Sequence, residues 1–263
     1  RQPTASHPRG LLVLDPYSRA TVVEHFTGGG HYLTNAVTEI VLGEGARLDY
    51  CLVVSEGEES FHVGRVRVEH GPGSHFNAST VTFGGALCRT EIHDRLGAEG
   101  AGCVLNGLYL GGGRQHVDNL TRVEHVSARC TSRELYKGIL DGRATGVFSG
   151  QLRVEEDARH SDATQLNQNL VLSGAATVDT LPHLDLLADD VRCAHAAEVE
   201  PLDEDRLFYL RSRGVPEGEA RALLTRAFAG EVLEHIQPAA WRDQVRAKVE
   251  AVLPGGSAWS PST

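Results

Sequence analysis

Methionine is absent from this sequence, aromatic residues make up only 6% of it, and its five cysteines form no Cys-x-x-Cys pair. Without such pairs, the sequence encodes neither a zinc ribbon nor a ferredoxin-type cluster site. The odd number of scattered cysteines and the lack of a signal peptide favour a reducing, cytoplasmic location. Because there is no Met, we expect Arg1 to be the start of a fragment.

Further absences exclude several functional classes. Asp and Glu total 35 against 25 Lys and Arg, and the resulting net charge of −10 argues against nucleic-acid binding. No stretch approaches the roughly 18 to 20 apolar residues that cross a membrane. The sequence also lacks a Gly-x-x-x-x-Gly-Lys-Ser/Thr phosphate loop and a Gly-x-Ser-x-Gly nucleophile elbow. ATP hydrolysis by this chain alone is therefore not expected.

Short strands with small residues between them dominate the first 200 residues. Alternation of apolar and polar residues predicts strands at 11–14, 20–26 and 35–42. Corners built from small residues begin at Gly45, Gly73, Gly100, Ser127 and Asp157. Their steps of 28, 27, 27 and 30 residues are typical of a β-solenoid, in which stacked coils bury a shared core. A β-sandwich made of hairpins is the alternative.

The pattern changes from strands to helices after Pro201. Asp203 is a good N-cap, and Gly214 suits the position just after a helix. Two more helices are expected, one opening at Pro216 and extending to Ile236, and one from Ala239 to about Leu253.

A thiol and an imidazole stand two residues apart at this transition. If the segment is a strand, Cys193 and His195 project from the same face and offer a sulfur and a nitrogen donor, which iron, zinc and copper favour. Two ligands do not complete a metal site, and a buried cysteine beside a hydrogen-bonded histidine is the alternative. For the amide-rich stretch 165–169 we expect hydrogen bonds between successive coils instead of a catalytic role. The isolated histidines are expected to be solvated or in the core: His62, His70, His75 and His93.

Several segments occur in an order that is specific to one family. They are Leu-Tyr-Lys-Gly at 135–138, Gly-Val-Phe-Ser-Gly at 146–150, Gln-Leu-Asn-Gln-Asn-Leu at 165–170, Val-Asp-Thr-Leu-Pro at 178–182, Ala-Asp-Asp-Val-Arg-Cys-Ala-His-Ala-Ala at 188–197 and Leu-Phe-Tyr-Leu-Arg-Ser-Arg-Gly-Val at 207–215. This set closely resembles the C-terminal part of SufD-like members of the SufB/SufD family, which belong to the SufB–SufC–SufD iron–sulfur cluster assembly complex. The resemblance is dense from about Ser132 to about Ile236 and thinner before it.

The resemblance implies a mostly β fold. It predicts a parallel β-helix (solenoid) core at 1–200, a small C-terminal α-helical domain for SufC docking at 201–253, and a flexible tail at 254–263. A helical N-terminal region usually precedes the β part in SufD-like proteins, and we expect it to be absent from this chain.

The resemblance also implies a non-enzymatic scaffold role. The solenoid would pair with SufB, the helices would dock the ATPase SufC, and Cys193 and His195 would contribute to iron or a nascent iron–sulfur cluster, transient and shared with SufB. SufB-like members carry a cysteine near Asn167 and a glutamate where Ala196 stands, so their absence favours the SufD type. The implied SufC-facing residues are Leu207, Phe208, Tyr209, Arg211, Arg213, Leu223 and Phe228.

Two other functions stay open. One is a purely structural solenoid partner of SufB in which Cys193 is merely buried. The other, weaker one is a stand-alone β-solenoid enzyme, which would need carboxylates converging on one face. A homodimer is expected when the chain is isolated, since an exposed edge strand invites pairing.

Overall fold

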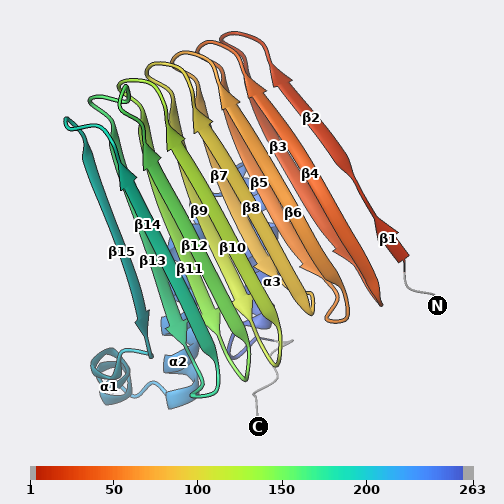
Figure 1. Ribbon diagram of the computed structural model, residues 1–263. Helices are drawn as coiled ribbons and strands as arrows, with labels where there is room; N and C mark the ends of the chain where they lie inside the picture. The colour runs from red at the N-terminus through yellow and green to blue at the C-terminus, as the bar shows by residue number, and fades with distance from the viewer. Residues whose placement is uncertain (1–3, 257–263) are drawn as a thin grey trace.

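The computed structural model describes residues 4–256 and shows a parallel β-solenoid followed by three helices (Figure 1). This confirms the predicted fold class. The strands are β1 (Thr4–Ser6), β2 (Arg9–Leu14), β3 (Arg19–Gly28), β4 (Tyr32–Leu42), β5 (Arg47–Glu56), β6 (Phe61–His70), β7 (His75–Phe83), β8 (Leu87–Leu96), β9 (Gly102–Gly111), β10 (His116–His125), β11 (Thr131–Leu140), β12 (Thr145–Val154), β13 (Asp162–Val171), β14 (Thr177–Leu186) and β15 (Arg192–Glu200).

Two parallel sheets form the walls of the solenoid. The even-numbered strands and β1 make one sheet, in the order β1-β4-β6-β8-β10-β12-β14, with β2 also pairing with β4. The odd-numbered strands make the other, in the order β15-β13-β11-β9-β7-β5-β3. From β2 onward each strand therefore pairs with the strand two places along the chain, one coil away, and inward-facing residues of successive coils stack in register.

One corner of the solenoid repeats a left-handed backbone conformation in every coil. The residues with positive φ there are Tyr17, Gly45, Gly73, Gly100, Arg129 and His160. The backbone N–H of each donates to a carbonyl of the next coil, as from Gly45 to Pro72 at 2.8 Å and from His160 to Asp190 at 2.7 Å. The predicted corners at Gly45, Gly73 and Gly100 coincide with this position. The last two were placed too early, at Ser127 and Asp157, because the left-handed position there is occupied by Arg129 and His160 and not by a small residue.

The core lies between the two sheets and is mainly aliphatic, as the alternation of apolar residues requires. Its largest fully buried side chains include Phe76, Ile92, Leu105 and Phe148. Their stacking along the solenoid supplies the burial that one coil could not provide alone.

Of the three helices, the second and third cover the outer face of the odd-strand sheet, and the first packs against the second. They are α1 (Glu204–Ser212), α2 (Glu217–Leu233) and α3 (Ala239–Val252), close to the predicted bounds, and Asp203 caps α1 by accepting from the N–H groups of Asp205 and Arg206, both at 3.0 Å. A second apolar cluster joins sheet residues such as Val81 and Leu108 to helix residues such as Val232 and Val249. Of the predicted tail, residues 257–263 lie outside the described range.

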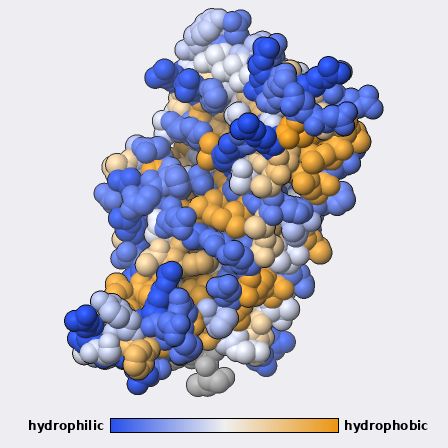
Figure 2. Space-filling view, turned by 90° about the vertical axis from the view of Figure 1, so that its left-hand side faces the viewer, coloured by the Kyte–Doolittle hydropathy of each residue, from blue (hydrophilic) through white to orange (hydrophobic). Residues whose placement is uncertain are grey.

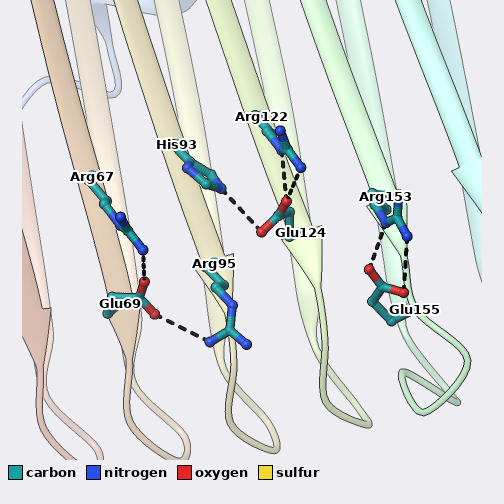
Figure 3. Close-up of polar contacts among 8 residues, drawn as sticks. All are labelled: Arg67, Glu69, His93, Arg95, Arg122, Glu124, Arg153 and Glu155. Atoms are coloured by element: carbon teal, nitrogen blue, oxygen red, sulfur yellow. Dashed lines mark hydrogen bonds and ion pairs between the residues drawn. The ribbon is translucent and has the colours of Figure 1, made fainter.

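The outer face of the even-strand sheet is exposed and carries a ladder of paired charges (Figure 3). Arg67 and Arg95 both contact Glu69, at 2.9 and 3.5 Å, and Arg122 and His93 both contact Glu124. Such pairs contribute little stability at a surface, but they keep a flat, wide sheet face hydrated and discourage its association with other sheets. Within residues 4–256, no helix is long and apolar enough to cross a membrane.

Candidate functional site

Cys193 and His195 lie on β15, the last strand of the solenoid. Within the described chain β15 pairs only with β13, and its other edge is free. The register places Cys193 beside Ala163 and His195 beside Gln165, both of which are buried inside the solenoid. The two side chains therefore share the inward face of the strand at the open end of the molecule.

The two residues differ in their surroundings. Cys193 is partly buried and packs against the main core, whereas His195 is exposed. Burial, and to a smaller extent the Asp162 carboxylate, raises the pKa of the Cys193 thiol, so the neutral thiol is favoured in the free chain. Among residues 4–256, no three His, Cys, Asp or Glu side chains gather in a way that could hold a metal ion. Cys193 and His195 thus form at most part of a site.

The amide-rich strand β13 links successive coils, as its sequence predicted. Asn167 Nδ2 donates to the backbone carbonyl of Tyr136 on β11 at 3.2 Å, and Asn169 Nδ2 donates to the backbone carbonyl of Glu198 on β15 at 3.4 Å. Gln165 Nε2 donates to Glu134 Oε2, one coil away on β11, at 2.5 Å. The interior next to the last coil is therefore polar and hydrogen-bonded.

Glu134 is a buried carboxyl that the sequence interpretation missed. Burial raises its pKa to about 7, with a smaller contribution from Asp94, against hydrogen bonds from Thr121 and Gln165. The alternation of β11 could have predicted this burial, because Glu134 stands at an inward position between the inward Ser132 and Tyr136.

Some histidines also lie inside the solenoid, as expected. His62 Nδ1 lies 3.1 Å from Glu56 Oε2, and His70 Nε2 lies 3.0 Å from Asp94 Oδ1. Both pairs are fully or almost fully buried, where an unpaired carboxylate would be costly. These contacts account for the two histidines as parts of the core.

The open end of the solenoid exposes apolar side chains beside Cys193 and His195. Val199 on β15 is exposed, as are Leu186 and Leu187 where β14 ends, and Leu181 is 62% exposed on the outward face of β14. Figure 2 views this end and shows apolar surface among the polar side chains. Exposed apolar side chains beside a free strand edge are typical of a surface that another chain covers.

The helical residues predicted to face SufC are divided by the fold. Phe208 is 72% exposed, and Tyr209 and Leu223 are exposed as well, next to an apolar groove between α1 and α2 that Leu210 and Leu224 also line. Arg211 and Arg213 are exposed, and the guanidinium of Arg213 lies over the Tyr209 ring.

Two of the residues predicted to face SufC offer little surface in this chain. Leu207 is only 2% exposed, so it belongs to the packing of α1 and offers no surface. Phe228 is partly buried against the solenoid, where the Lys137 amine lies 4.4 Å from its ring centroid. Phe228 therefore faces the sheet, whereas Leu207 is buried on α1, which packs against α2.

Comparisons with known proteins agree with this architecture. The model of the SufBD core domain family of SUF-system iron–sulfur cluster assembly matches residues 1–228. The chain is 33% identical to an iron–sulfur cluster assembly SufBD family protein of Synechocystis sp., over 93% of this chain and 56% of that protein. It is 32% identical to the iron–sulfur cluster assembly protein SufD of Escherichia coli, over 96% of this chain and 60% of SufD. It is 32% identical to an iron–sulfur cluster assembly SufBD family protein of Mycobacterium bovis, over 91% of this chain and 62% of that protein. The chain spans a little over half the length of these curated relatives.

Proposed function

Because this chain belongs to the SufBD core family of iron–sulfur cluster assembly, we propose that it is a SufD-like scaffold component. In this role it pairs with SufB through the open end of the solenoid and docks the ATPase SufC through α1 and α2. It contributes Cys193 and His195 to iron or a nascent cluster, which is the cargo of the assembly.

One observation carries the proposal: Cys193 and His195 lie on the inward face of the terminal strand, whose outer edge is free within the described chain. Residues on the last coil can face a second protein, whereas the same residues in an earlier coil would be covered by the next coil. The exposed Leu186 and Val199 give that second protein an apolar surface to cover.

The chemistry of the pair fits iron. A thiolate and a neutral imidazole nitrogen are both ligands of iron in proteins. The raised pKa of Cys193 means that its proton is held until positive charge approaches, and the proton is released as the thiolate binds. His195 supplies a ring lone pair without carrying charge. The remaining ligands would come from SufB.

The exposed helical residues suit the second contact. Tyr209 and Leu223 line an apolar groove, and Phe208 is exposed beside Tyr209 on the same helix. Aromatic residues of this kind often anchor protein interfaces. Phe208→Ser and Leu223→Ser are expected to weaken SufC binding by the 263-residue chain, measured by calorimetry. Leu11→Ser removes an equally exposed apolar side chain at the far end of the solenoid and should leave binding unchanged. Equal binding by all three variants would contradict this docking surface.

The decisive test of the metal role uses the complex reconstituted with SufB and SufC. Cys193→Ala, His195→Ala and the double variant are expected to reduce cluster formation, followed by absorbance of the iron–sulfur chromophore. Glu198→Ala is the matched control, because Glu198 lies on the same strand but on its opposite face. Undiminished cluster formation in the double variant, with the complex intact, would refute the metal role.

A second candidate is a purely structural partner of SufB. The partial burial of Cys193 against the core and its raised pKa favour this alternative. Under it, the double variant loses stability or SufB pairing but forms clusters normally once the complex is assembled.

A further inference from the structure

The terminal histidine continues a column of polar residues that begins deep inside the solenoid. Register pairs Glu134 on β11 with Gln165 on β13, and Gln165 with His195 on β15. All three occupy inward positions on successive coils, and neighbouring strands in a sheet lie about 4.8 Å apart. Side chains of this length therefore lie within reach of one another along the column.

The orientation of the middle residue is fixed from the inside. Gln165 is 1% exposed, and its Nε2 donates to Glu134 Oε2 at 2.5 Å. On the facing sheet Gly150 leaves room for the amide: a Cβ there would lie 2.4 Å from Nε2 and 2.7 Å from Oε1 of Gln165. Because the carboxyl takes the amide nitrogen, the amide oxygen is left for a different partner.

In the described part of the chain, the amide oxygen of Gln165 lacks the hydrogen-bond partner that a buried acceptor normally has. Gln165 Oε1 is buried and finds no hydrogen-bond partner within residues 4–256. A buried acceptor left unpaired carries its desolvation cost without compensation. On the side of Gln165 away from Glu134, the register neighbour is His195, and a neutral imidazole always carries one N–H.

We propose that Gln165, itself oriented by Glu134, is a positioning residue for His195. The exposed imidazole turns inward, so that Gln165 Oε1 accepts the N–H of one ring nitrogen and the lone pair of the other faces the open end. The inference rests on the proposed function, because only there does the free lone pair have a use. Histidines that bind metals commonly donate their second ring N–H to a protein acceptor, which fixes the tautomer and the ring orientation. An amide oxygen does this without adding charge beside Cys193.

The test measures the tautomer of His195 directly. The 263-residue chain, without metal and with ¹⁵N-labelled histidine, is observed by long-range ¹H–¹⁵N NMR above the pKa of histidine, and His195→Ala assigns the signals. One tautomer is expected to dominate in the parent chain. Gln165→Leu should shift the tautomer ratio about fivefold toward that of free histidine, which corresponds to the loss of a hydrogen bond worth about 1 kcal/mol.

The controls separate positioning from general damage. Gln168→Leu changes a glutamine on the outward face of the same strand, which donates to Glu198 at 2.7 Å, and it should leave the ratio unchanged. If Gln165→Leu fails to fold because Glu134 loses its partner, E134L/Q165L removes both partners together. A parent ratio equal to that of free histidine, or an unchanged ratio in the folded Gln165 variant, overturns the proposal.

This experiment can fail independently of the proposed function. The tautomer is measured in the free chain, so it does not depend on SufB, SufC or a cluster. Normal cluster formation by the Cys193/His195 double variant would refute the function and leave the tautomer result standing. A tautomer ratio insensitive to Gln165 would refute the positioning and leave the metal role open to its own test.

Discussion

Replacing the buried carboxyl of Glu134 by an amide is expected to stabilise the protein above pH 7 and to change little near pH 4. The pKa of Glu134 is raised by burial from its ordinary 4.5 to about 7. Between these two values the folded protein holds a proton that the unfolded chain has released, so the free energy of unfolding falls as the pH rises. Below pH 4.5 Glu134 is protonated in both the folded and the unfolded chain, so it does not reduce the free energy of unfolding.

The size of the effect follows from the gap between the two pKa values. That gap corresponds to about 3 kcal/mol once the pH exceeds 7. Glu134→Gln keeps the volume of the side chain and an oxygen that can accept the hydrogen bond from Gln165, but it cannot ionise. The variant should therefore be more stable than the parent by about 3 kcal/mol near pH 8.5, and by less than about 1 kcal/mol near pH 4.

Urea unfolding followed by circular dichroism at those two pH values measures the difference. Other titrating groups, such as the buried His125, are common to both proteins and cancel when parent and variant are subtracted. Glu124→Gln is the matched control: its pKa is lowered by His93 and Arg122 despite partial burial, so its removal should give no gain at high pH. A stability difference for Glu134→Gln that is the same at both pH values would refute the reasoning.

Two further predictions concern packing. Gly150→Ala places a Cβ 2.4 Å from the Gln165 amide, which Glu134 holds in place, and should lower the free energy of unfolding by about 1 to 3 kcal/mol. Gly174→Ala meets nothing within 4 Å and should be nearly neutral, and equal losses would contradict the steric argument. Glu231→Ala leaves the buried amine of Lys137 without its carboxylate and should cost about 2 kcal/mol. Lys137→Met, which keeps an apolar stem against Phe228, should cost less; the reverse order in thermal unfolding would be contrary to expectation.

Local signals predicted the elements of the fold well. The alternation of apolar and polar residues located β2, β3 and β4, and the cap at Asp203 and the glycine at 214 marked the ends of α1. The repeating small residues at Gly45, Gly73 and Gly100 located corners, because left-handed backbone is easiest for glycine. The same signal failed at Arg129 and His160, where larger residues adopt that conformation and hydrogen bonds to the next coil hold it.

The sequence by itself determined the strand period, the stacking repeat, the helix ends and the placement of Cys193 and His195 at alternate positions of one strand, because these depend on neighbours along the chain. Only the tertiary structure decided which residues meet. Gln165 reaches Glu134 across 31 residues and Lys137 reaches Glu231 across 94, and no local pattern encodes either separation. It also decided that the Cys193 strand is the last coil. The edge of β15 that stays unpaired within residues 4–256 is likewise a property of the assembled sheet.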